Sequence, residues 1–134
     1  MGARRFTGVL CLLSAGACSR ATSAPIEVVP GQSVQLPEGA SAVVSSDAVR
    51  VRFVGAGDSR CPSDVVCITA GDAVIVLALA GAGAERTDTV YLSRPPRSVR
   101  YGAYRFEAVD LQPYPVSQGP RASKTLTLRV LKAE

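Results

Sequence analysis

From residue 26 onward the apolar residues stand in short runs, and proline, glycine and small polar residues separate each run from the next. This regular interruption by turn-forming residues constrains the fold most strongly, because no long stretch shows the spacing of an amphipathic helix. Short runs between turn residues are typical of β-strands, and a series of them predicts a sandwich or barrel. We expect an all-β fold, a small immunoglobulin-like β-sandwich of seven or eight short strands. The runs cover residues 26–29, 33–36, 42–44, 49–53, 73–80, 87–92, 104–108 and 126–130.

The pattern within the runs predicts which side chains face the core. Val49, Val51 and Phe53 alternate with two arginines, which indicates a strand with one buried face and arginines toward solvent. Residues 73–80, A-V-I-V-L-A-L-A, are continuously apolar, so we expect a strand buried on both faces that pairs with residues 87–92. Tryptophan is absent and aromatic residues are few, so the core must consist mainly of Val, Leu, Ile and Ala.

The first residues have the three parts of a secretory signal peptide. Arg4 and Arg5 form a positive start, and residues 6–13 form an apolar segment too short to span a bilayer as a helix. Residues 15–17, Ala-Gly-Ala, form a small-residue cleavage site. We therefore expect residues 1–17 to be removed during export. This removal leaves 15 − 2 = 13 basic and 11 acidic residues, a net charge of +2.

A cysteine, Cys18, follows the expected cleavage site directly. Here the chain resembles bacterial lipoproteins, in which the first mature residue is a cysteine that carries the lipid. The resemblance implies a membrane anchor on Cys18 and, because Ser19 comes next, the periplasmic face of the outer membrane. Ala-x-Ala also suits the ordinary signal peptidase, and cleavage by that enzyme would give a secreted protein. Residues 18–25 then form an anchor and a flexible tether, and residues 26–134 form the β-sandwich domain.

Two cysteines remain for the folded domain. Cys11 leaves with the signal peptide and Cys18 is the expected lipid site, so Cys61 and Cys67 are left. An even pair in an exported protein predicts a disulfide. A structural zinc site would need further Cys or His ligands. A redox dithiol typically has a C-x-x-C spacing, whereas five residues separate this pair.

Three features together resemble a group of uncharacterised bacterial secreted proteins and lipoproteins. D-x-R-C-P-x-x-V-x-C occupies residues 58–67, A-G follows at residues 70–71, and L-x-P-Y-P occupies residues 111–115. The resemblance covers roughly residues 47–132 and implies an exported β-domain, without implying an activity. We expect a tryptophan just before the A-G pair in that group, where this chain has Thr69.

The loop around the cysteine pair is the candidate binding site. Asp58 and Arg60 precede the first cysteine, and Asp64 lies between the two cysteines. One interpretation is a partner-binding surface, because loops held on a scaffold often carry function. Another is an internal Asp–Arg pair that holds the loop closed. A third is a small ligand or a metal ion such as calcium at the Asp58–Asp72 loop, although the spacing matches no calcium-binding loop.

Two further segments have two interpretations each. Residues 111–115, L-Q-P-Y-P, resemble a polyproline recognition segment, or else form a strand-ending turn with Tyr114 over the edge of the core. The second segment places four arginines close together in the sequence, Arg94, Arg97, Arg100 and Arg105, among Tyr91, Tyr101 and Tyr104. That pattern fits anionic lipid headgroups or an acidic glycan, or else a solvated strand face with a basic connector.

Catalytic equipment is not recognisable in the sequence. The chain has no histidine, no nucleophile–base pair and no Gly-rich phosphate loop, so we expect no enzyme, no cofactor and no metal site. A net charge of +2 gives no support for nucleic-acid binding. The resulting hypothesis is an envelope-anchored lipoprotein domain that binds a macromolecular partner, an envelope protein or glycan, through the loop that the Cys61–Cys67 disulfide closes. The alternatives are a passive structural or accessory lipoprotein and small-ligand or metal-ion binding at the same loop.

Overall fold

The computed structural model describes residues 23–134. The predicted signal peptide (residues 1–17), the lipidation site Cys18 and most of the predicted tether therefore lie outside the described residues. Residues 23–134 contain no helix that would span a membrane. They form nine β-strands: β1 (Ile26–Val28), β2 (Ser33–Pro37), β3 (Ser41–Val44), β4 (Val49–Asp58), β5 (Ala73–Ala80), β6 (Arg86–Tyr91), β7 (Ser98–Tyr101), β8 (Tyr104–Gln112) and β9 (Thr125–Lys132).

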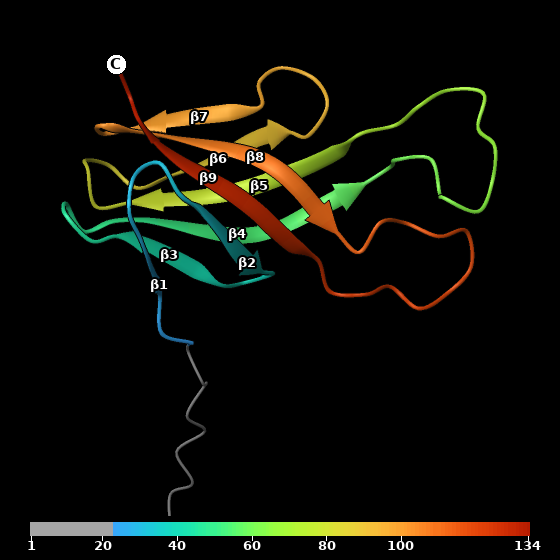
Figure 1. Ribbon diagram of the computed structural model, residues 1–134, viewed down its shortest axis with the longest axis horizontal. Helices are drawn as coiled ribbons and strands as arrows, with labels where there is room; N and C mark the ends of the chain where they lie inside the picture. The colour runs from blue at the N-terminus through green and yellow to red at the C-terminus, as the bar shows by residue number, and fades with distance from the viewer. Residues whose placement is uncertain (1–22) are drawn as a thin grey trace, which may run out of the picture.

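The strands form two sheets that pack face to face (Figure 1). One sheet has five strands in the order β1-β3-β4-β5-β6, and the other has four strands in the order β2-β9-β8-β7. Every pairing is antiparallel except that of β1 with β3, which is parallel. The predicted all-β sandwich is therefore confirmed.

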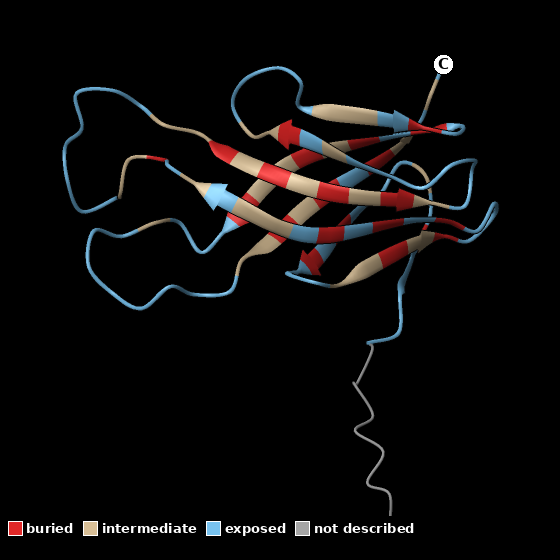
Figure 2. Ribbon diagram, turned by 180° about the vertical axis from the view of Figure 1, so that it is seen from behind, coloured by how far each residue is buried: buried red, intermediate tan, exposed pale blue. Residues whose placement is uncertain are grey.

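The core lies between the two sheets and is built by alternation along the strands (Figure 2). Alternate residues of a strand point to opposite faces, so each strand contributes every second side chain to the interior. As predicted from the composition, the interior is mostly aliphatic, with Phe53 and Phe106 as its largest fully buried side chains. The other fully buried side chains include Leu36, Val51, Ile75, Leu77, Leu111, Leu126 and Leu128.

Two strand predictions need correction. The ninth strand is β7, which the sequence placed in the basic connector; it is a short edge strand that pairs only with β8. The strand β5 was expected to be buried on both faces, but only one face is buried. Ile75 and Leu77 have no exposed surface, whereas Val74 and Val76 are partly exposed on the outer face. The outer face of β5 is open because residues 23–134 form two layers, and none of them covers this sheet from outside.

Two long loops leave the sandwich at the same end (Figure 1). The first, residues 59–72, joins β4 to β5 within the five-stranded sheet. The second, residues 113–124, joins β8 to β9 within the four-stranded sheet. The described chain begins on a side away from both loops, as Figures 1 and 2 show. This end of the sandwich brings the candidate site residues together.

Candidate functional site

The first loop starts with a buried ion pair. Asp58 is the last residue of β4, and its two carboxylate oxygens accept hydrogen bonds from Arg60 Nε at 2.8 Å and Nη2 at 2.7 Å. The side chains of Asp58 and Arg60 are 7 % and 6 % exposed. Two parallel bonds of this kind match the flat guanidinium to the flat carboxylate and fix both in orientation.

The same ion pair also ties the first loop to the second. Arg60 Nη2 donates to the main-chain oxygen of Leu111 at 2.9 Å, near the end of β8. Lys124, at the end of the second loop, donates from Nζ to Asp58 Oδ2 at 2.8 Å and to the main-chain oxygen of Pro113 at 2.6 Å. We call Asp58, Arg60 and Lys124 the loop clamp. Its three side chains connect both sheets and both loops at one point.

The clamp changes the acidity of Asp58. Burial of the carboxyl group would raise its pKa, but the hydrogen bonds from Arg60 and Lys124 outweigh burial and lower the pKa from 3.8 to about 2. Asp58 is therefore ionised at every pH near neutrality. The carboxylate is the acceptor on which the clamp depends.

Close backbone packing seals the base of the first loop. Ser59 N donates to the main-chain oxygen of Asp72 at 3.0 Å, and Ser59 Oγ donates to the same oxygen at 2.9 Å. A Cβ atom on Gly71 would lie 1.6 Å from the main-chain oxygen of Ser59. Only glycine fits at this position, because any side chain would push the two ends of the loop apart.

The predicted disulfide is confirmed: Cys61 and Cys67 are bonded, with their Cα atoms 5.9 Å apart. It closes a small ring within the first loop. A second set of contacts joins this ring to the second loop, because Ser63 N donates to the main-chain oxygen of Pro115 at 3.1 Å. Asp64 accepts hydrogen bonds from the main-chain nitrogen, at 2.8 Å, and the hydroxyl group of Ser117, which together lower its pKa.

The outer surface of the two loops carries exposed apolar side chains. Val66 and Ile68 are fully exposed at the tip of the first loop, and Val65 is 43 % exposed. Tyr114 and Val116 of the second loop are also exposed. We call these five residues the loop patch. Isolated exposed apolar residues are common in proteins, but a group of them on two fastened loops is typical of an interaction surface.

The predicted site residues have different places in this arrangement. Asp58 and Arg60 lie inside the clamp, so they do not offer their charges to solvent; this is the internal pair that the sequence left as an alternative. Asp64 is exposed, and it fastens one loop to the other. Sequence reasoning missed Lys124, and it missed Val66 and Ile68 as surface residues. The only signal for the last two was their position beside Cys67, one residue before it and one after it.

The three aspartates of the first loop do not converge on one point. Asp58 bonds to the clamp and Asp64 to Ser117, while Asp72 Oδ1 accepts hydrogen bonds from the main-chain nitrogens of Ala73 and Ser93. Among residues 23–134, no group of three or more Asp, Glu, Cys or His side chains is arranged to hold a metal ion. The geometry therefore gives the ion-binding interpretation no support.

The other two candidate segments lie at the end of β8 and around β7. Residues 111 and 112 end β8, residues 113–115 begin the second loop, and Arg60 stacks over the ring of Tyr114, 4.3 Å from its centre. Tyr101 and Tyr104, which the sequence placed among the arginines, are buried in the core. Tyr91 is only partly buried, and the Arg94 guanidinium lies over its ring, 4.0 Å from the centre.

Comparison with protein families, with characterised proteins and with solved structures finds no match to this chain.

Proposed function

We propose that this chain is a non-enzymatic, lipid-anchored envelope domain that binds a protein partner through the loop patch. The anchor is Cys18 at the start of the mature chain, on the periplasmic face of the outer membrane; without lipid on Cys18, the protein is secreted. The tether then joins the membrane to a side of the sandwich away from the two loops. The loops are thus free to meet a partner.

One observation carries the proposal: Val66 and Ile68 are fully exposed on a loop that is otherwise tightly fastened. The disulfide fastens Cys67 to Cys61, and the clamp and the Ser59–Asp72 contacts hold the two ends of the loop that carries these side chains. A loop that is fastened at its ends and by a disulfide loses less conformational entropy on binding than a free one, which favours affinity.

The chemistry of the loop patch favours a protein over a glycan. Four of its five side chains are aliphatic, and aliphatic side chains suit an apolar pocket on a protein partner. Its single aromatic ring, Tyr114, has the Arg60 guanidinium on one face. A neutral sugar is typically held by aromatic faces together with a row of polar groups, and the five side chains of the patch supply one ring and no such row.

The test is photo-crosslinking in intact cells, with a crosslinking amino acid at position 66. The expected result is one covalent adduct with a defined protein. The adduct should disappear when Ile68→Ser is added, while the protein melts at an unchanged temperature. A matched control places the crosslinker at Val54, an exposed apolar residue on β4, and should give no such adduct.

Two results would count against the proposal. Adducts of equal yield from positions 66 and 54 would show non-specific contact. Failure to form any adduct would favour a passive structural role, for which the fold and the anchor are sufficient.

A further inference from the structure

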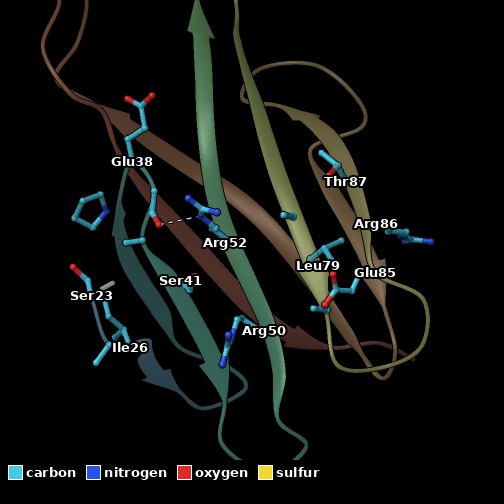
Figure 3. A pocket seen from close by; sticks show the side chains of 16 residues that line it. Ser23, Ile26, Glu38, Ser41, Arg50, Arg52, Leu79, Glu85, Arg86 and Thr87 are labelled. Atoms are coloured by element: carbon cyan, nitrogen blue, oxygen red, sulfur yellow. Dashed lines mark hydrogen bonds between the residues drawn. The ribbon is translucent and has the colours of Figure 1, made fainter. Parts of the chain in front are cut away.

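The outer face of the five-stranded sheet is hollowed into a groove of about 980 Å³ (Figure 3). Strands β3, β4 and β5 form its floor. Residues 23–26 form one side, residues 37–41 form one end, and residues 85–87 form the other side. The groove is separate from the loop patch, and the inference below does not depend on the proposed function.

Two arginines stand on the floor of this groove. Arg50 and Arg52 are two positions apart on β4, so both point outward from the same face, about 7 Å apart along the strand. Their cross-strand neighbours are uncharged: Arg52 lies between Ser41 and Ala78, and Arg50 lies between Val43 and Ala80. These neighbours do not cover the two arginine side chains, which are exposed and accessible to a ligand.

No carboxylate neutralises this pair among residues 23–134. Neither arginine takes part in an ion pair, although Glu38 and Glu85 line the groove. Residues 1–22 contain no Asp or Glu, so they offer no carboxylate side chain either. Two like charges held close together, with no carboxylate in direct contact with either, favour an anion between them.

Arg52 is also held in position. Its Nε donates a hydrogen bond to the main-chain oxygen of Gly39 at 3.1 Å, which Figure 3 shows as a dashed line. This bond fixes the guanidinium plane and leaves both terminal nitrogens free of protein partners within the described chain. Two such nitrogens match the two oxygens of a carboxylate.

We propose that this groove binds an acidic oligosaccharide, with carboxylates of the sugar chain on Arg50 and Arg52. A peptide fits less well, because the groove crosses the middle of the sheet, where neighbouring strands already pair and offer no edge. Sugar hydroxyls find partners in Ser41 and Thr87, which line the groove. No aromatic side chain lines it, so it lacks the stacking platform of a single-stranded nucleic-acid site.

The test is titration calorimetry with a short oligogalacturonate. The variant Arg50→Gln/Arg52→Gln should weaken binding at least about tenfold, the loss of one or two charge-assisted bonds. The matched control is Arg105→Gln/Arg129→Gln, which removes the same charge from two exposed arginines of the four-stranded sheet and should change affinity by less than about twofold. Ala80→Glu keeps both arginines but puts a carboxylate beside Arg50, and should also weaken binding.

Two control ligands test specificity: a malto-oligosaccharide of equal length, which is uncharged, and an oligoglutamate of equal charge. Both should bind at least about tenfold more weakly than the oligogalacturonate. The inference is overturned if oligogalacturonate does not bind, or if both double variants lose affinity equally. It is also overturned if Ala80→Glu has no effect, or if oligoglutamate binds as tightly as the sugar. Equal melting temperatures of all variants establish that each protein is folded.

Discussion

Replacing Asp58 by asparagine tests the loop clamp most sharply. Asparagine keeps the size of the side chain but removes the negative charge, and it can turn an NH₂ group toward Arg60 or Lys124. Both cations would then lie largely buried, at 6 % and 14 % side-chain exposure, without their carboxylate partner. Removing one partner of a buried ion pair typically costs about 3–5 kcal/mol.

The lowered pKa of Asp58 gives a second, independent value for the free energy that the clamp contributes to folding. Lowering a pKa by one unit corresponds to about 1.4 kcal/mol, so a change from 3.8 to about 2 corresponds to roughly 2 kcal/mol of folding free energy. The folded-state pKa is the lower one, so this stabilisation is present above the unfolded-state pKa and is lost as the pH falls toward 2. We expect Asp58→Asn to lower the free energy of unfolding by about 2–4 kcal/mol at neutral pH.

The assay is urea unfolding of wild type and variant at a series of pH values. The difference in unfolding free energy should be constant above about pH 5 and should shrink by roughly 2 kcal/mol as the pH falls to 2 and below. Asp88→Asn is the matched control, because Asp88 pairs with Arg86 at a more exposed position and should cost less than about 1 kcal/mol. The reasoning is refuted if both variants lose equal stability, or if the Asp58→Asn difference does not change with pH.

Three further predictions concern the same end of the sandwich. Gly71→Ala should lower the melting temperature by about 10 °C or more, because the new methyl group would collide with the Ser59 main chain; an unchanged melting curve would show that the loop base is loose. Reducing the Cys61–Cys67 bond should cost about 2 kcal/mol, or roughly 5–10 °C, in differential scanning calorimetry; two free thiols titrated in the untreated native protein would contradict the bond. Arg60→Lys should cost about 1–3 kcal/mol in urea unfolding, because a lysine cannot make the two parallel bonds to the carboxylate; a neutral result would mean that charge alone holds the clamp.

Strand positions were predictable where polar and apolar residues alternate. Arg50 and Arg52 between apolar residues identified β4 and its buried face correctly. The same reasoning failed for β5, because a run without polar residues does not show which face is open. It also missed β7, because this four-residue edge strand has a single fully buried side chain, Tyr101, and so shows no alternation.

The candidate site was predictable only where its parts are close in the sequence. Asp58 and Arg60 are two residues apart, so an internal pair was a visible alternative from the start. Lys124 is 66 residues from Asp58, and nothing in the sequence connects them until β8 and β9 bring the second loop to the first. Val66 and Ile68 were hidden for another reason: apolar residues are usually core, and only the fold shows that these two face solvent.

The most direct test of the central claim is the affinity of the protein for the partner identified by crosslinking. Two proteins are compared: Val66→Ser/Ile68→Ser, and the control Val29→Ser/Val54→Ser, which removes exposed valines outside the loop patch. If the patch is the binding surface, the first variant should weaken binding about 10- to 100-fold, as expected for apolar residues at the centre of an interface. The control should bind like the wild type. Equal affinities of the two variants would contradict the claim that this protein binds through the loop patch.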